Sequence, residues 1–131
     1  MLCDSNILIY AAEPGDTVCQ PYVERADAVI ASVTRIEVLG FPGYAALPAE
    51  RQTRLREVVM SMLEAPLHDP VIQRAIALRQ QKKMGLADAI IAATALEYAL
   101  PLVTRNVEDY RHVPGLTLIN QIGRASCRER V

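Results

Sequence analysis

Four carboxylates stand at positions where this sequence could bring them around one metal ion: Asp4, Glu37, Asp88 and Asp109. The first of them interrupts two apolar runs in the opening stretch MLCDSNILIY, and a buried carboxylate is costly unless it has a partner. Carboxylates gathered closely repel one another and raise one another's pKa unless a cation lies between them. Oxygen ligands without His or Cys select Mg²⁺ or Mn²⁺. The set therefore predicts a divalent-metal site.

Each carboxylate also has a purely structural interpretation. Asp4 could cap the helix that follows it, and Glu37 could complete a capping box with Thr34. Asp88 could favour a helix dipole, and Asp109 could stabilise a turn. These interpretations do not explain why all four carboxylates follow predicted strands or open predicted helices. They also do not explain why three of the four have no Lys or Arg directly beside them in the sequence. That coincidence favours the metal site.

The elements that would position the carboxylates follow from alternating strand-like and helix-like segments. Short β-rich runs predict strands at Leu2–Cys3, 28–33, Leu102–Thr104 and 116–120. Helices are predicted at 7–12, from Thr34 onward, at 70–83 and at 86–100, and a turn or short helix at 107–113. A further helix is predicted to begin at Pro48, because the apolar residues that follow it recur at helical spacing: Leu55, Val58, Val59, Met62 and Leu63. This alternation predicts an α/β fold with a parallel sheet and helices on both faces. Ligands bind such sheets beyond the carboxyl ends of the strands, where all four carboxylates can meet.

Length and composition restrict the class of protein. The chain has 131 residues, of which 51% are apolar and 22% charged, which predicts one globular domain. The longest apolar runs fall far short of a membrane span, and the N-terminus lacks the basic segment of a signal peptide, so we expect a soluble, cytoplasmic protein. Three cysteines form no CxxC pair and the two histidines are far apart, so neither a disulfide framework nor a zinc site is indicated.

The last ten residues, IGRASCRERV (122–131), differ from the rest of the chain. They carry three arginines, one glutamate and a cysteine without apolar periodicity, and they resemble the translation of a common sequencing-adapter oligonucleotide. We therefore predict that the domain comprises residues 1–121 and that 122–131 are a non-native tail that does not pack. Without the tail, the basic count falls from 14 to 11 and the acidic count from 15 to 14, so the net charge changes from −1 to −3.

The motifs, taken in order, resemble those of PIN-domain ribonucleases, and specifically those of VapC-like toxins from type II toxin–antitoxin systems. The matching stretches are CDSNILIY (3–10), SVTRIE (32–37), LADAIIAATA (86–95), LVTRNVEDY (102–110) and PGLTLIN (114–120). Together they extend over nearly the whole chain up to Asn120. The resemblance implies a PIN-like three-layer α/β/α fold with a short central parallel sheet.

The resemblance also implies a function and its residues. Asp4, Glu37, Asp88 and Asp109 would be the acidic quartet that binds Mg²⁺, or Mn²⁺, with Ser5 and Asn106 as polar neighbours. Some relatives place an acid at the position of Asn106, so either Asn106 or Asp109 could complete the site. The implied activity is metal-dependent endoribonuclease cleavage of RNA phosphodiester bonds. The implied partners are an RNA substrate, a separate antitoxin protein and a second copy of the chain. Phosphate contacts could come from Arg51, Arg54, Arg56, Arg79, Lys82, Lys83 and Arg105, although basic residues on helices more often form only a solvated face.

Two other functions fit parts of the sequence. A noncatalytic PIN-like RNA-binding module would share the fold but would not need four carboxylates. An α/β phosphatase or phospho-acceptor domain would use an Asp after its first strand and a second acid two residues later, where this chain has Asn6. For the partners, the apolar segment 38–44 could form a groove for a partner helix, or it could be an ordinary loop that covers the core.

Overall fold

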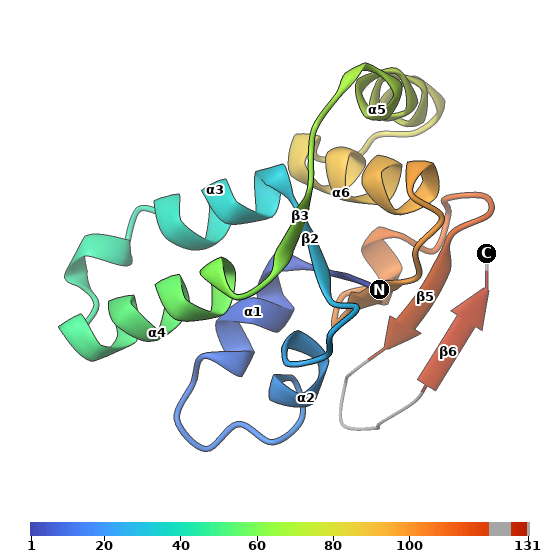
Figure 1. Cartoon of the computed structure of the whole chain (residues 1–131). Helices are drawn as coiled ribbons and strands as arrows, with labels where there is room; N and C mark the ends of the chain where they lie inside the picture. Colours follow the sequence, from blue (N-terminus) through green and yellow to red (C-terminus); the bar gives the residue numbers. More distant parts are fainter. Residues whose placement is uncertain (121–126, 131) are drawn as a thin grey trace.

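The chain folds around one twisted sheet, shown in Figure 1. The computed structural model describes residues 1–120 and 127–130. Within these residues the sheet has the strand order β3-β2-β1-β4-β5-β6. The first five strands in this order pair in parallel, and β6 pairs antiparallel to β5. The strands are β1 (Leu2–Cys3), β2 (Val29–Ala31), β3 (Leu63–Ala65), β4 (Leu102–Thr104), β5 (Thr117–Asn120) and β6 (Cys127–Arg130). The predicted parallel sheet is confirmed.

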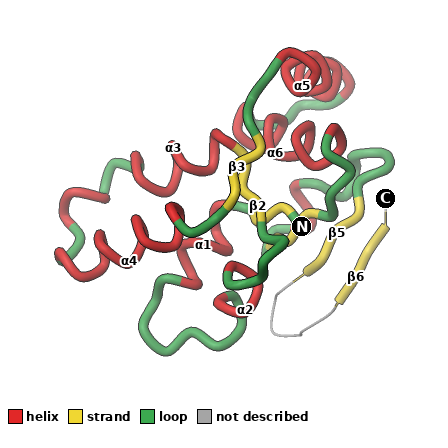
Figure 2. Tube along the Cα trace, viewed as in Figure 1, coloured by secondary structure: helices red, strands yellow, loops and turns green. Residues whose placement is uncertain are grey.

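Helices cover both faces of this sheet. They are α1 (Ser5–Ala11), α2 (Gln20–Val23), α3 (Ser32–Gly40), α4 (Ala49–Met60), α5 (Asp69–Gln81) and α6 (Leu86–Glu97), with short 3₁₀ turns η1 (Tyr44–Ala46) and η2 (Val107–Asp109). Figure 2 shows α5 and α6 on one side of the sheet and α1 to α4 on the other. None of the helices in the described residues combines the length and the apolar character needed to cross a bilayer.

Alternation along the strands builds a separate core on each face. Successive side chains of a strand point to opposite faces, so Leu2 and Leu102 pack with α5 and α6 while Cys3 and Val103 pack with α1 to α4. Helix α6 is apolar around most of its circumference because it lies between the sheet and α5. The three-layer α/β/α architecture predicted from the sequence is therefore confirmed.

Several local predictions were wrong. The capping box is not formed, because strand β2 runs directly into α3 and Ala31 is the N-cap. Thr34 therefore lies inside the helix, and its buried hydroxyl has no hydrogen-bond partner among the described residues. Leu63 does not continue α4 but begins β3, an edge strand of only three residues. Pro48 is the N-cap of α4 rather than part of its first turn. The four-residue helix α2 was not predicted.

The C-terminal tail contributes one strand. Residues 127–130 form β6, which pairs with β5 in the register Thr117↔Arg130 to Asn120↔Cys127. The expectation that the tail would not pack is wrong for these four residues; residues 121–126 and 131 lie outside the described part of the chain. Pairing needs only the free backbone groups at the edge of β5, so the lack of apolar periodicity did not exclude it. That 122–131 are non-native stays a prediction.

Candidate active site

Asp4 lies at the carboxyl end of β1, in the middle of the sheet. It is the N-cap of α1: its Oδ1 accepts a hydrogen bond from the backbone N–H of Ser5 at 2.7 Å. Its Oδ2 accepts one from the hydroxyl of Thr104, at the end of β4, at 2.9 Å. The carboxylate is only 5% exposed. The capping interpretation is therefore correct for one oxygen, while the other is held by a neighbouring strand.

The charge of Asp4 is poorly compensated. Burial raises its pKa from 3.8 to about 6; the hydrogen bonds from Thr104 and Ser5 oppose this rise, and the negative charges of Asp88 and Glu37 add to it. The ion pairs seen among residues 1–120 do not include Asp4. A buried carboxylate without a cation destabilises the fold. Asp4 is thus the group in this structure that would gain most from a bound cation.

Glu37 reaches the same place from α3. The hydroxyl of Ser5 donates a hydrogen bond to Glu37 Oε1 at 2.5 Å, so α1 and α3 are joined directly beside Asp4. Ser5, which the resemblance suggested as a polar neighbour of the carboxylates, thus contacts both Asp4 and Glu37. Because Ser5 uses its backbone N–H for Asp4 and its hydroxyl for Glu37, one residue positions two carboxylates.

Asp88 approaches from the opposite layer, in the first turn of α6. The hydroxyl of Tyr110, a side chain that is 1% exposed, donates to Asp88 Oδ1 at 3.1 Å. Burial raises the pKa of Asp88; the hydrogen bond from Tyr110 opposes this, and the charges of Asp109 and Glu37 add to it. The pKa of Tyr110 is itself raised, chiefly by burial and then by nearby carboxylates, so this phenol remains a donor.

Asp109 and Asn106 both follow β4 in or beside η2, and both are exposed. The backbone N–H of Asn106 donates to the Thr104 hydroxyl at 2.9 Å, which fixes the loop against the residue that holds Asp4. Asp109 is coupled to the cluster by its effect on the pKa of Asp88. The structure thus places Glu37 and Asp88 near enough to Asp4 to raise its pKa, whereas the exposed Asp109 affects only Asp88.

Two residues of the site were missed by the sequence analysis. Thr104 and Tyr110 carry no charge, and their hydrogen bonds to Asp4 and Asp88 join residues far apart in the chain. The only signal for Thr104 was its place as a polar residue at the end of an apolar strand. No comparable signal marked Tyr110.

The donor set fits a hard divalent cation. Carboxylate oxygens are the ligands that Mg²⁺ and Mn²⁺ prefer, and a bound cation would stabilise the charged forms of Asp4 and Asp88, whose pKa values are raised by burial and, to a lesser extent, by neighbouring carboxylates. In the described residues, no three His, Cys, Asp or Glu side chains surround a single point at metal-binding distance. Mg²⁺ does not require this, because it usually keeps several waters and binds proteins through one or two carboxylates. Asp4 and Asp88 are the residues that would hold it, with Glu37 and Asp109 alongside.

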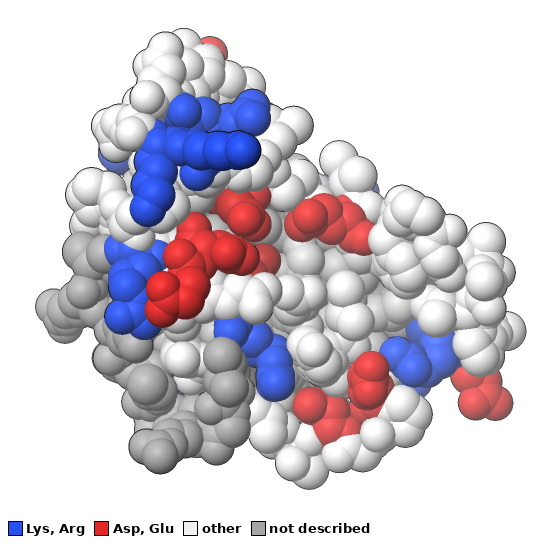
Figure 3. Space-filling view, turned by 180° about the vertical axis from the view of Figure 1, so that it is seen from behind, with Lys and Arg blue, Asp and Glu red and all other residues white. Residues whose placement is uncertain are grey.

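The surface has a matching distribution of charge. Figure 3 shows acidic side chains gathered on one face of the molecule, with basic side chains on either side of them. A cation would be attracted to the acidic zone, and a polyanion would need the flanking basic groups in order to approach it.

Comparison with known proteins identifies this architecture. Residues 1–116 match the PIN domain over most of the chain. The chain belongs to the PIN-domain family. Curated protein sequences contain no match to it.

Solved PIN-type structures agree with this assignment. A toxin–antitoxin complex from Klebsiella pneumoniae contains a chain 30% identical to this one, with a TM-score of 0.74, over 92% of this chain and 97% of that one. VapBC2 from Rickettsia felis, bound to a promoter DNA fragment, is 19% identical, with a TM-score of 0.76 over 92% and 98%. DNA-bound VapBC from Salmonella typhimurium is 18% identical, with a TM-score of 0.72 over 92% and 97%. The last two similarities show the fold alone.

Proposed function

We propose that this PIN domain is a divalent-metal-dependent endoribonuclease and the toxin of a toxin–antitoxin pair. The observation that carries the proposal is the buried Asp4, which sits among other carboxylates without a cation among residues 1–120. The Klebsiella pneumoniae complex, in which a chain is 30% identical to this one, supports the toxin role. The four carboxylates distinguish the proposal from a noncatalytic RNA-binding module.

The residues of the chain would act mainly by positioning. When bound, Mg²⁺ would supply a Lewis acid that makes a water more nucleophilic and stabilises charge on the phosphate oxygens. Thr104 and Ser5 hold the Asp4 carboxylate in a fixed orientation. Ser5 also holds Glu37, and Tyr110 holds Asp88, so the carboxylates on the two sides of the sheet are each fixed by a hydroxyl. No nucleophilic side chain is required.

Cleavage of a labelled total-RNA pool tests this function. We expect cleavage by the wild type in millimolar Mg²⁺, none in chelator, and none by Asp88→Asn, which has the same size but lacks the charge. An RNA pool left intact by the wild type at every Mg²⁺ concentration, while the folded protein still binds RNA, would identify a noncatalytic module instead.

The proposal includes two protein partners and a cytoplasmic location. For an antitoxin, the support is the Klebsiella pneumoniae structure, a toxin–antitoxin complex that contains a chain 30% identical to this one. In segment 38–44, Leu39, Phe41 and Tyr44 are partly buried against the protein's own core, which favours its interpretation as a loop that covers the core over that of a groove for a partner. We assign the homodimer instead to the exposed apolar side chains of α3, β3 and α5, namely Ile36, Leu63, Ile72 and Ile76.

Light scattering tests the dimer. We expect twice the chain mass for the wild type and the chain mass for Ile76→Glu, which places a charge on this surface. A wild-type protein that stays monomeric at tens of micromolar would refute it. Toxicity is tested separately: cells that express active protein and grow normally would contradict the toxin role.

A further inference from the structure

Arg105, which directly follows a residue of the site, stacks on an aromatic ring. The guanidinium of Arg105 lies over the ring of Tyr10, 4.3 Å from its centroid. Arg105 directly follows Thr104, whose hydroxyl holds Asp4, and Tyr10 lies on α1, the helix that Asp4 caps. The pair therefore joins the two elements that position the central carboxylate.

Arg105 differs from the arginines whose charge a carboxylate neutralises. In the described residues, Arg25 pairs with Asp27 and Arg74 with Glu97, whereas Arg54 makes a hydrogen bond to a carbonyl oxygen instead. No such ion pair is found for Arg105 within residues 1–120. Its other contact is with the buried thiol of Cys19, whose pKa is raised by burial and lowered in part by the hydrogen bond and charge of Arg105.

This combination suits a phosphate. A guanidinium presents several N–H donors in a rigid fork that matches phosphate oxygens, and stacking on an aromatic ring fixes its plane while leaving its edge available. A polyanion that approaches the four carboxylates is repelled by them, so a fixed cation on the elements that hold Asp4 would offset part of that repulsion. Tyr10 is 42% exposed, so the pair is accessible from solvent.

We propose that Arg105, held in place by Tyr10, is a phosphate-binding residue for the RNA strand next to the scissile bond. This inference rests on the proposed ribonuclease function. It selects one residue from the seven basic residues that the sequence suggested for phosphate contact. Others are engaged elsewhere: Arg54 with the carbonyl of Ala12, Arg79 with that of Met84.

Steady-state cleavage of a single-stranded RNA oligonucleotide in Mg²⁺ tests the inference. Loss of a charge-assisted hydrogen bond in Arg105→Gln should raise KM about tenfold, with kcat changed less than about threefold. One fewer phosphate contact should also reduce the slope of log kcat/KM against log salt by about 0.7. The Mg²⁺ concentration for half-maximal activity should not change, because Arg105 touches no carboxylate of the site. Arg105→Lys should restore part of the KM effect.

The role of Tyr10 is tested by non-additivity. Tyr10→Phe keeps the ring and should behave as wild type, whereas Tyr10→Leu should raise KM about threefold. The double variant Arg105→Gln/Tyr10→Leu should be no worse than Arg105→Gln, because the ring acts through the guanidinium.

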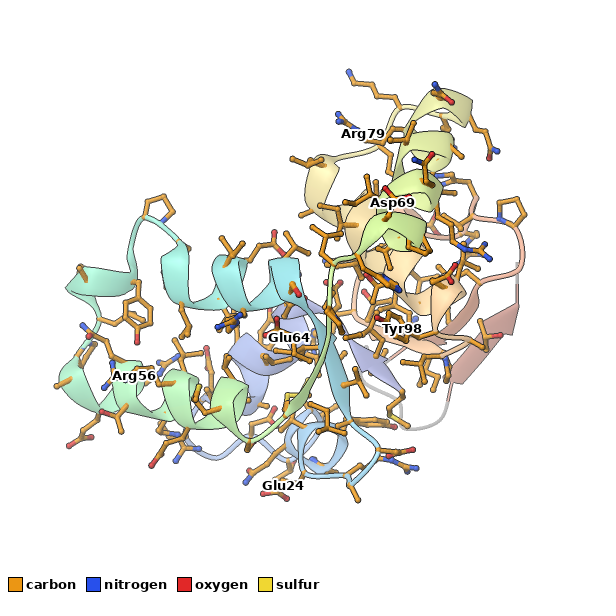
Figure 4. All side chains as sticks on the ribbon, turned by 45° about the horizontal axis from the view of Figure 1, so that its top comes forward. Glu24, Arg56, Glu64, Asp69, Arg79 and Tyr98 are labelled. Carbon is orange, nitrogen blue, oxygen red and sulfur yellow. The ribbon has the colours of Figure 1, made fainter. Side chains whose placement is uncertain are left out.

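Arg25→Gln is the matched control. Arg25 directly follows Glu24, which is labelled at the end of α2 in Figure 4, and it precedes the amino end of β2, whereas the carboxylates follow the carboxyl ends of the strands. It is exposed, pairs with Asp27, and is not one of the seven basic residues that the sequence suggested for phosphate contact. Its removal takes away one positive charge and should leave KM and the salt slope unchanged.

The outcomes separate this inference from the proposed function. If the wild type cleaves RNA but Arg105→Gln has a wild-type KM and salt slope, the phosphate-binding role is refuted and the ribonuclease function stands. An equal KM effect of Arg25→Gln would show only a general charge effect and would also refute it. If the wild type does not cleave RNA, both fall.

Discussion

Asp4→Asn is expected to stabilise the metal-free protein at neutral and alkaline pH. The wild-type carboxylate is buried and its pKa is raised from 3.8 to about 6, so folding disfavours its charged form. A carboxyl group whose pKa is higher in the folded state contributes its full stability below the unfolded pKa, and loses that stability as the pH rises through the folded pKa. Asn carries no charge at any pH and therefore avoids the loss.

The size of the effect follows from the shift. A pKa raised from 3.8 to about 6 corresponds to about 3 kcal/mol, at about 1.4 kcal/mol per unit. Asn can still accept from Ser5 N–H, and its amide can donate to the Thr104 hydroxyl, but the exchange costs part of the gain. We expect a net stabilisation of about 1 to 3 kcal/mol near pH 8, shrinking to nearly zero near pH 4. For 131 residues the upper value raises Tm by about 10 °C.

Thermal unfolding in chelator and in millimolar Mg²⁺ measures the difference in stability between Asp4→Asn and the wild type near pH 8 and near pH 4. In Mg²⁺ the order should reverse or the gap should close, because the wild type gains binding energy that Asp4→Asn cannot gain. Asp16→Ala is the matched control: Asp16 Oδ2 accepts from the backbone N–H groups of Cys19 and Gln20 at 3.0 and 2.7 Å, and it takes no part in the site. Its loss should cost about 1 kcal/mol with or without metal.

The reasoning fails if Asp4→Asn is less stable than the wild type in chelator near pH 8. It also fails if the difference in stability between the two proteins is the same near pH 4 as near pH 8. Either result would mean that Asp4 acts mainly as the cap of α1. Equal destabilisation in both buffers, with RNA cleavage retained, would also remove the metal site.

Further predictions concern the hydroxyl groups and the tail. Tyr110→Phe removes the hydrogen bond that lowers the pKa of Asp88, so half-maximal activity should require several-fold more Mg²⁺ while the fold is retained, as titration of cleavage and circular dichroism would show. Ser5→Ala should weaken Mg²⁺ stabilisation of Tm in the same way, because Glu37 loses its donor; an unchanged Mg²⁺ response would argue against a role for Glu37. Truncation after Gln121 should leave cleavage unchanged and lower Tm by a few degrees, since β5 loses its pairing with β6; an unchanged Tm would favour a tail that does not pack.

The sequence predicted the parts of this fold that depend on local pattern. Apolar strands bounded by polar residues and the long apolar helix α6 were placed within a few residues of their observed bounds. The rule that ligands meet the carboxyl ends of parallel strands then brought the four carboxylates to one edge. Strand β3 was missed because it has only three residues and its first residue, Leu63, also fits the helical spacing of the segment before it.

The parts that could not be predicted depend on contacts between distant residues. Arg105 stacks on Tyr10, and Thr104 bonds to Asp4 across about a hundred positions, separations at which periodicity carries no information. Tyr110 looked like any aromatic residue of a core until its hydroxyl was placed against Asp88. The failure at Thr34 is different: its Thr-x-x-Glu spacing is a true capping signal, which a strand running directly into the helix overrode.

The two interpretations of Asp4, helix cap and metal ligand, are compatible in this structure. A carboxylate has about four lone-pair sites, and here Ser5 uses one on Oδ1 while Thr104 uses one on Oδ2. The two bonds fix the orientation of the group from α1 and from β4, and they leave acceptor capacity on both oxygens. The same bonds are too few to offset burial, because the pKa of Asp4 still rises to about 6. A cap that is well placed but electrostatically unsatisfied is the state expected of a carboxylate whose remaining partner is a cation.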